Sequence, residues 1–304
     1  MDLSIVILTW NRRAEVLETV RRTLPFASRV GAEVIVVDNG STDGTSEALS
    51  SAYPQIDLVR LPSNRGASGW NAGLERARGE WVMTLDDDSS PEGDWAAEVA
   101  PVGRANRDAG ILACRVLKGA ARMPVTEGWG ERTTDFIACG AIFRRTVFDR
   151  VGYYDPKIFL YSHEKEYALR VLAAGFDIVY VPDFLVYHRA AGAHRSSERY
   201  VSLGVEGAAY RIVSYYPLHL VPFALILMLM HHARWCRRHE DRISRYLGIV
   251  SRALARGVSL AAANRRPLPA AVRRRIASIS RAEAANGGAQ QRLFARLAPS
   301  GFFW

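Results

Sequence analysis

Cysteine is scarce in this chain of 304 residues. Its three cysteines, Cys114, Cys139 and Cys236, form no CxxC or CxxH spacing, so the sequence indicates neither a disulfide framework nor a structural zinc site. A reducing compartment fits that pattern. The N-terminus also lacks the order of a secretory signal, because its apolar run at 5–8 precedes the basic pair at 12–13. We therefore expect a cytoplasmic protein.

Two nucleotide-binding motifs are missing as well. The chain has no GxGxxG fingerprint and no GK[ST] sequence, which argues against NAD-dependent enzymes and P-loop kinases. Apolar residues, in contrast, are plentiful. They make up 49% of the chain, enough to bury a large core, and the length fits one large domain with an appendage.

The excess of positive charge is confined to one end of the chain. The net charge is +9, from 40 basic and 31 acidic side chains. Residues 211–304 hold 16 arginines, no lysine and three acidic residues, a net of +13, so residues 1–210 carry −4. A front of that sign does not attract a polyanion along its length. We therefore expect no nucleic-acid partner and divide the chain into an acidic front and a basic C-terminal region.

The front alternates short apolar runs with helical stretches. The runs are continuous, which predicts strands buried on both faces, and their βαβ order predicts an α/β fold with a mostly parallel central sheet. We expect strands at 4–9, 34–38, 58–61, 81–86, 110–116, 136–143 and 177–181, and helices at 13–23, 46–52, 72–77 and 164–174.

Past residue 210 the chain has an uninterrupted apolar run of eleven residues, Leu220–Met230. A membrane-spanning helix takes about 20 apolar residues, so this run alone is too short. Its flank, which includes Trp235 and Arg237, favours a helix that lies in the membrane interface. A core or interdomain helix, and a true span that draws in neighbouring residues, stay open as alternatives.

Polar residues follow the first two expected strands. Thr9 and Asn11 come after the first strand, and Asp38 and Asn39 end the second. In an open parallel sheet, ligands bind beyond the carboxyl ends of the strands, where Asp or Asn can bond a pyrimidine ring or a ribose hydroxyl. The competing interpretation is an ordinary turn and helix N-cap, which prefer the same residue types.

Three consecutive carboxylates, Asp86, Asp87 and Asp88, directly follow a strand-like run. Such a cluster is costly unless a cation or hydrogen-bond donors compensate it. In an extended segment Asp86 and Asp88 point the same way, so both can bind one Mg²⁺ or Mn²⁺ ion. A solvated acidic turn is the alternative.

Three later features place ligand chemistry at the ends of expected elements. The loop 64–73 is rich in small residues and leads into a helix, so its backbone can approach an anion closely. Glu164 falls in the first turn of a helix, where a carboxylate is favoured. His188 ends an apolar run; it could complete a metal site or be structural.

Taken together, these segments resemble the family 2 glycosyltransferases, which are inverting enzymes with the GT-A type nucleotide-sugar-binding fold. The resemblance covers roughly residues 3–192 and is carried by TWNR, VVDNGSTDGT, NRGASGWNAG, LDDD, CGAIFRRTVFDRVGYYD, FLYSHEKEYALR and VYHR. It implies a GT-A catalytic domain over 1–210, with a nucleotide-sugar half to about 115 and an acceptor half from about 116. The helical region 211–304 follows.

The resemblance also implies roles for individual residues. The metal would be held by Asp86, Asp88 and His188, as Mg²⁺ or Mn²⁺. Nucleotide and donor binding would involve Thr9, Asn11, Arg12, Asp38, Asn39, Asn64, Gly66, Asn71, Asp86 and Asp87. The acceptor side would include Cys139, Gly140, His163 and Glu166.

The chain departs from the family at the catalytic base. Relatives usually have an acidic pair where this chain has His163-Glu164, so Glu164 matches the usual aspartate with one more methylene. Glu166 is the rival for this role. His163 would tune the base or contact the acceptor.

The implied activity is inverting transfer of a sugar from a nucleoside-diphosphate sugar, preferably UDP- or dTDP-linked, to an acceptor hydroxyl. A bacterial glycan or lipid-linked glycan is the expected acceptor, and we expect peripheral contact with the inner face of the cell membrane. A nucleotidyltransferase is the alternative enzyme, and a non-catalytic membrane or nucleic-acid binder is the alternative outside catalysis. A homo-oligomer stays open.

Overall fold

A computed structural model describes residues 2–126, 129–190, 197–239 and 244–286. Its first half supplies the parallel part of a large sheet. The strands are β1 (Leu3–Thr9), β2 (Glu33–Asp38), β3 (Asp57–Arg60) and β4 (Trp81–Asp86). They lie in the order β3-β2-β1-β4 with all three pairings parallel, so their carboxyl ends meet at one edge.

The second half of the sheet is mixed. It contains β5 (Ser89–Glu92), β6 (Ala109–Lys118), β9 (Ala141–Arg144) and β10 (Asp177–His188), with the short β7 (Met123–Pro124) and β8 (Arg132–Thr133) at its margin. β9 runs antiparallel between β4 and β6, whereas β6 and β10 are parallel. β6 and β10 therefore run in the same direction as β4, and the carboxyl end of β10 lies at the same edge of the sheet as that of β4.

The strand expected at 136–143 is only partly correct. β9 begins at Ala141, and the preceding residues form a 3₁₀ turn, η3 (Ala138–Gly140). The hydroxyl of Thr84 on β4 donates to the carbonyl of Ala138 at 2.5 Å, which fixes this turn over the end of the sheet.

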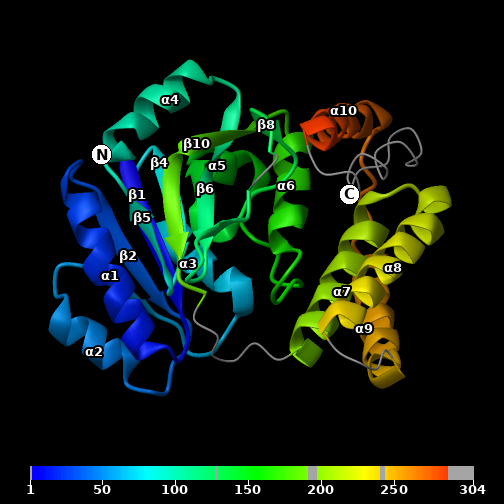
Figure 1. Cartoon of the computed structure of the whole chain (residues 1–304), viewed down its shortest axis with the longest axis horizontal. Helices are drawn as coiled ribbons and strands as arrows, with labels where there is room; N and C mark the ends of the chain where they lie inside the picture. The colour runs from blue at the N-terminus through cyan, green and yellow to red at the C-terminus, as the bar shows by residue number, and fades with distance from the viewer. Residues whose placement is uncertain (1, 127–128, 191–196, 240–243, 287–304) are drawn as a thin grey trace.

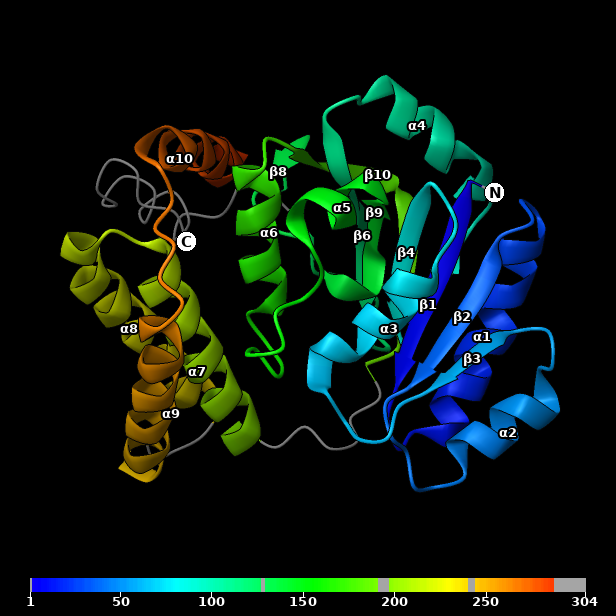
Figure 2. The same ribbon diagram turned by 180° about the vertical axis from the view of Figure 1, so that it is seen from behind.

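Apolar side chains cover both faces of the sheet, as continuous strand patterns predict. Val6 faces one core, whereas Ile5 and Ile7 face the other. The first core contains α3 (Trp70–Arg76), α5 (Thr146–Val151), α6 (His163–Ala173) and α7 (Ser197–Tyr215); the second contains α1 (Arg13–Ser28), α2 (Thr45–Ala52) and α4 (Val99–Ala105). Figures 1 and 2 show these two helical layers.

The C-terminal region is helical and lies beside the sheet (Figure 1). After α7 come η4 (Leu218–Leu220), α8 (Val221–His239), α9 (Ser244–Ala262) and α10 (Ala270–Asn286). The boundary expected at residue 210 falls inside α7, which is buried along most of its length. The boundary expected at 115 likewise falls inside β6.

Several arginines of the basic region hold it against the front. Arg265 donates to the carbonyls of Val213 and Tyr216 near the end of α7, and Arg275 donates to the carbonyl of Leu172 at the end of α6 at 2.6 Å. Cations are favoured at helix C-termini because the carbonyls there carry partial negative charge. Some of the arginines behind the net charge of +13 therefore bind the C-terminal region to the front of the same chain.

Most of the apolar run Leu220–Met230 lies in α8, which begins at Val221. Ala224 and Met228 are buried, whereas Phe223, Ile226 and Met230 are exposed at 37%, 57% and 44%. In the described part of the chain, no helix is both long and apolar enough to cross a membrane.

Candidate functional site

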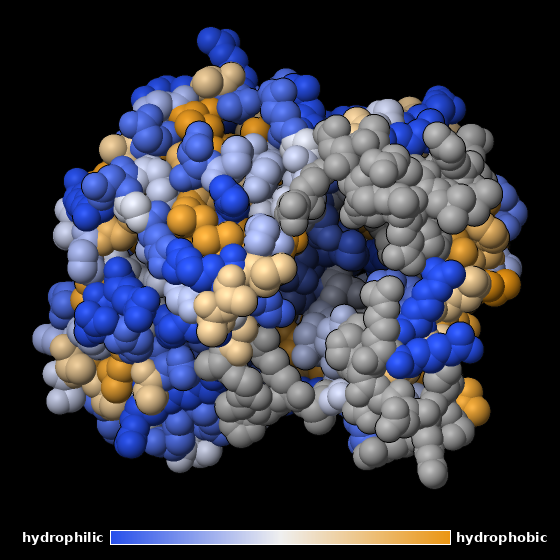
Figure 3. All heavy atoms as spheres, in the orientation of Figure 1, coloured by the Kyte–Doolittle hydropathy of each residue, from blue (hydrophilic) through white to orange (hydrophobic). Residues whose placement is uncertain are grey.

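A cavity of about 410 Å³ opens at the carboxyl ends of β1 and β4. η3 and the first turn of α6 also contribute residues to its lining. Figure 3 shows the surface hollowed between the front and the helical region. Most of the expected site residues line the cavity, namely Thr9, Arg12, Asn39, Asn64, Gly66, Asp86, Asp87, Asp88, Cys139, His163, Glu164 and His188.

Five expected site residues are not part of the cavity lining: Asn11, Asp38, Asn71, Gly140 and Glu166. Asp38 accepts hydrogen bonds from the Ser41 amide at 2.9 Å and from the Ser46 hydroxyl. These contacts match the turn interpretation of this segment. Asn11 similarly accepts from the Thr42 amide at 2.7 Å.

Asn71 and Gly140 have packing contacts. The side chain of Asn71 accepts from the Tyr154 amide at 3.1 Å and donates to the Tyr154 carbonyl at 2.9 Å, which joins α3 to the loop before α6. A Cβ on Gly140 would lie 2.8 Å from a methyl carbon of Val116, so a larger residue does not fit there.

Glu166 is fully buried, away from the cavity. Its carboxylate oxygens lie 2.8 and 2.9 Å from the Arg170 guanidinium and 3.2 Å from that of Arg266, and Oε1 also accepts from the Tyr215 hydroxyl. This cluster links α6, α7 and the segment before α10.

The three carboxylates do not form the extended segment that we expected. Asp86 ends β4, and Asp87 and Asp88 form a two-residue turn into β5. Arg12 holds this turn, because its two terminal nitrogens lie 2.8 Å from Asp87 and 3.0 Å from Asp88. The Thr9 hydroxyl also donates to Asp87 at 3.2 Å.

The electrostatics of the two turn carboxylates differ. Burial raises the pKa of Asp87 to about 7, although Arg12 acts to lower it. Burial also acts to raise the pKa of Asp88, but the adjacent His188 and Arg12 hold that pKa well below its usual range. Asp88 is therefore a fixed anion at the floor of the cavity.

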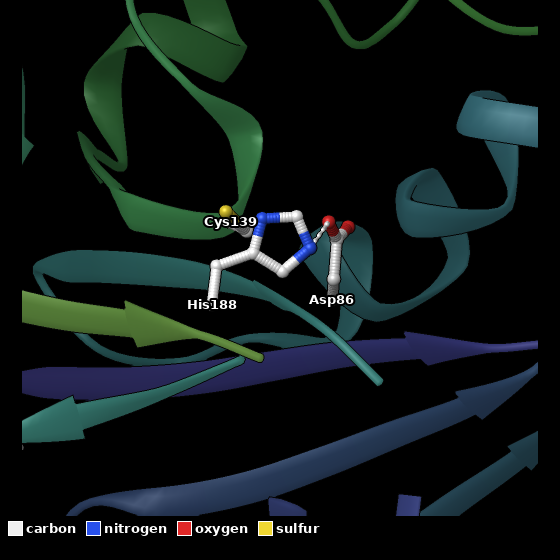
Figure 4. A group of neighbouring side chains, drawn as sticks. All are labelled: Asp86, Cys139 and His188. Atoms are coloured by element: carbon white, nitrogen blue, oxygen red, sulfur yellow. Dashed lines mark ion pairs between the residues drawn. The ribbon is translucent and has the colours of Figure 1, made fainter. Parts of the chain in front are cut away.

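His188, at the end of β10, faces the carboxylates. Its Nε2 lies 3.0 Å from Oδ1 of Asp88 and 3.8 Å from Oδ2 of Asp86. Donor atoms of Asp86, His188 and Cys139 all lie within 4.8 Å of one another. Figure 4 shows the imidazole between the carboxylate and the thiol, with Nε2 on the carboxylate side.

These donors fit a divalent cation. The carboxylate of Asp86 and the imidazole of His188 are hard oxygen and nitrogen donors of the kind that suits Mn²⁺ or Mg²⁺. Asp88 is not part of this group of mutually close donors, although its Oδ1 lies 3.0 Å from Nε2 of His188. Cys139 is less suited, because burial and the nearby Asp86 raise the pKa of its thiol well above the usual value. A neutral thiol is a poor metal ligand.

Glu164 is presented by a sharp turn at the start of α6. Tyr161 and Ser162 have φ values of +60° and +58°, a left-handed conformation that is unusual for residues other than glycine. Gly207 of α7 permits this turn, since its Cβ position would lie 3.0 Å from the Tyr161 carbonyl oxygen. The Glu164 carboxylate is 26% exposed and accepts weakly from the Ala138 amide at 3.4 Å.

The glycine-rich loop closes another side of the cavity. Gly66 has a φ of +60°, and a Cβ there would lie 1.9 Å from the Phe159 carbonyl oxygen, so only glycine fits. Asn39 fixes the loop by donating to Asn64 Oδ1 at 3.1 Å and to the Gly66 carbonyl at 3.0 Å.

Sequence reasoning did not identify several residues that line the cavity, among them Trp10, Trp70, Lys118, Phe159, Tyr161 and Arg199. Trp10 and Trp70 stood inside segments that we had singled out, so their position was a usable signal. Arg199 follows no motif. Its guanidinium lies 6.0 Å from the Trp10 ring centroid and 5.9 Å from that of Phe159.

Comparison with known proteins identifies relatives. A family model described as "Glycosyl transferase family 2" matches residues 4–162. The uncharacterized glycosyltransferase YwdF of Bacillus subtilis is 29% identical over 178 residues, 53% of this chain and 65% of that protein. An undecaprenyl-phosphate 4-deoxy-4-formamido-L-arabinose transferase of Pectobacterium carotovorum is 27% identical over 192 residues, 58% of this chain and 56% of that protein. The chain thus spans less than two thirds of either relative.

Solved structures with the same fold extend over nearly the whole chain. Staphylococcus aureus TarS in complex with UDP has a TM-score of 0.60 at 16% identity and covers 97% of this chain and 90% of its own. The mannosyltransferase PcManGT of Pyrobaculum calidifontis, in complex with GDP-Man and Mn²⁺, has a TM-score of 0.55 at 19% identity and covers 97% and 83%. This chain has the GT-A fold of these proteins and belongs to glycosyl transferase family 2.

Proposed function

We propose that the protein is an inverting, metal-dependent glycosyltransferase. It transfers a sugar from a nucleoside-diphosphate sugar, with UDP- and dTDP-linked donors preferred, to a hydroxyl of a bacterial glycan or lipid-linked glycan. The observation that carries the proposal is one cavity whose lining includes Asp86, Asp88 and His188 together with Glu164. Solved relatives with UDP or with GDP-Man and Mn²⁺ support this kind of donor.

Asp86, Asp88 and His188 would hold the cation. A bound divalent cation would neutralise the charge that develops on the diphosphate leaving group. Arg12 orients the carboxylate turn through its contacts with Asp87 and Asp88. Because these contacts hold the site in place beforehand, the site does not need to rearrange as charge develops during the reaction.

Glu164 acts as the general base. Its carboxylate removes the proton of the acceptor hydroxyl, which attacks the anomeric carbon from the face opposite the diphosphate. A single displacement inverts the configuration and needs no covalent glycosyl-enzyme. Glu166 is a poor alternative base, because Arg170, Arg266 and Tyr215 enclose its carboxylate.

We also propose that different regions of the chain have different roles. Residues 1–210 form the catalytic domain, with donor binding up to about 115 and acceptor binding beyond it, although α7 joins this domain to the region 211–304. The C-terminal region contacts an anionic membrane surface at the inner face of the cell membrane. Exposed Phe223, Ile226 and Met230 on α8, followed by exposed Arg234 and Arg237, support this contact. Figure 3 shows hydrophobic side chains along that outer edge.

A screen of nucleotide sugars with and without Mn²⁺ or Mg²⁺ tests the activity. We expect cation-dependent release of nucleoside diphosphate from one of them. Release of pyrophosphate from a nucleoside triphosphate and a sugar phosphate would instead support the nucleotidyltransferase alternative.

Vesicle flotation tests the membrane contact separately. We expect binding to anionic vesicles that weakens with salt and is lost in Ile226→Glu. Met123→Glu is the matched control, because Met123 is 61% exposed but lies on β7, away from α8. Equal binding by the wild type and Ile226→Glu would contradict the contact.

A further inference from the structure

Three aromatic side chains beside Glu164 bury polar atoms that make no hydrogen bond within the described residues. These atoms are Nε1 of Trp70, the hydroxyl of Tyr154 and both ring nitrogens of His163. The three residues are only 3%, 2% and 5% exposed. Buried polar atoms are nearly always hydrogen-bonded, so four of them in one cluster require an explanation.

The three rings form one continuous group. The rings of Trp70 and His163 lie 6.0 Å apart between centroids at an interplanar angle of 27°. The Tyr154 ring lies 5.5 Å from that of His163 and 6.0 Å from that of Trp70. The cluster therefore joins the start of α3 to the start of α6.

Two members of the cluster reach the cavity. Trp70 and His163 line it together with Glu164, whereas Tyr154 is not part of the lining and lies behind them. His163 Nδ1 lies 3.6 Å from Oε2 of Glu164, beyond a hydrogen bond. The side chains of Trp70 and His163, with their unpartnered atoms, therefore lie in the wall of the cavity together with the proposed base.

The chemistry of these atoms selects a hydroxylated ligand. The indole of Trp70 only donates, whereas a neutral imidazole both donates and accepts. A sugar hydroxyl can do both, so it can satisfy the two side chains together.

We propose that Trp70 and His163 form a sugar-binding subsite that determines specificity next to Glu164. Hydroxyl groups of a pyranose ring satisfy Nε1 of Trp70 and the imidazole nitrogens of His163. The inference rests on the proposed glycosyltransferase function. The ring comes either from the donor sugar or from the acceptor, and the experiment below separates these two sources.

A second tryptophan provides a matched control. Trp95 is 6% exposed and packs among aromatic rings, but its Nε1 donates to the Glu92 carbonyl at 2.8 Å. Trp95 does not line the cavity. Replacement by phenylalanine thus removes a paired N–H at Trp95 and an unpaired one at Trp70.

The test compares Trp70→Phe and Trp95→Phe, using the nucleotide sugar that passes the screen, its own nucleoside diphosphate and the acceptor. We expect Trp70→Phe to raise the KM of one sugar substrate about three- to tenfold, the value of one hydrogen bond, with little change in kcat or thermal midpoint. Affinity for the nucleoside diphosphate stays unchanged. Trp95→Phe lowers the thermal midpoint and leaves both KM values unchanged.

Two variants of His163 test the same subsite without changing the shape of the Trp70 side chain. We expect His163→Phe to raise the same KM, and His163→Asn, which keeps a donor and an acceptor, to recover part of the affinity. A raised donor KM assigns the subsite to the donor sugar, and a raised acceptor KM assigns it to the acceptor.

Unchanged KM values for both substrates in Trp70→Phe and His163→Phe, with an active wild type, would overturn the subsite alone. The orphaned atoms would then be satisfied by water. A wild type that releases nucleoside diphosphate from no nucleotide sugar would instead contradict the proposed function, and the subsite with it.

Discussion

In one part of the cavity lining Arg12, Thr9 and His188 contact the carboxylates of Asp87 and Asp88, whereas in another part Trp70 and His163 bury polar atoms that no described residue satisfies. The first part is ordered by contacts within the chain. In the second, we propose that a substrate supplies the hydrogen bonds. Substitutions in the first part should therefore reduce both stability and activity, whereas those in the second should reduce activity alone.

The largest expected effect comes from the proposed base. Glu164→Gln should lower kcat about 10²- to 10⁴-fold, the usual contribution of general base catalysis, with an unchanged circular dichroism spectrum and thermal midpoint. Glu98→Gln, at an exposed position outside the cavity lining, is the control. Near-normal turnover of Glu164→Gln would assign the base elsewhere.

Asp88→Asn tests the part of the cavity lining in which Arg12 and His188 contact the carboxylates. We expect about a 10²- to 10³-fold loss of activity, because the substitution weakens the proposed site for the cation that would stabilise the charge of the leaving group. We also expect a lower thermal midpoint, because Arg12 and His188 lose their anionic neighbour. Asp94→Asn, which changes a carboxylate that is 79% exposed, should alter neither. An inactive Asp88→Asn variant with wild-type stability would contradict the expected difference between the two parts of the cavity lining.

Glu166→Gln separates structure from chemistry on the same helix as Glu164. The buried Glu166 carboxylate has two arginine partners, and loss of one partner from a buried pair costs about 3–5 kcal/mol. We expect a clear drop in the free energy of unfolding, measured with urea, and less than about a tenfold loss of kcat. A large loss of kcat with unchanged stability would revive Glu166 as the base.

The smallest expected effect is a pH dependence in the C-terminal region. Burial, with a smaller contribution from His231, lowers the pKa of His232 to about 4. Because the unfolded chain binds the proton first, stability should be complete above about pH 6.5 and fall as the pH drops towards 4, by at most about 3 kcal/mol. His232→Gln should flatten that part of a urea-unfolding series. An identical pH dependence in the variant would exclude His232 as its source.

Local patterns could predict the fold to a large extent. Continuous apolar runs located β1, β2 and β4, because strands buried on both faces need apolar residues at every position. The turn before β9 was missed, since Phe136–Gly140 is as apolar as a strand. What makes it a turn is the contact of Ala138 with Thr84, far away in sequence.

The residues of the candidate site also include some that local patterns predict and some that they do not. The cluster Asp86–Asp88 could be predicted because consecutive carboxylates after a buried strand are costly without compensation. Trp70 and His163 lie 93 positions apart, and only the packing of α3 against α6 brings their rings together. Arg199 was missed because no local pattern separates it from the other arginines of the chain.

The most direct measurement is the identity and configuration of the products. Wild-type protein with its nucleotide sugar, acceptor and Mn²⁺ is followed by proton NMR. We expect nucleoside diphosphate and a glycoside of inverted anomeric configuration, and we expect both to be lost when the cation is chelated. Retained configuration, or pyrophosphate as the released product, would contradict it.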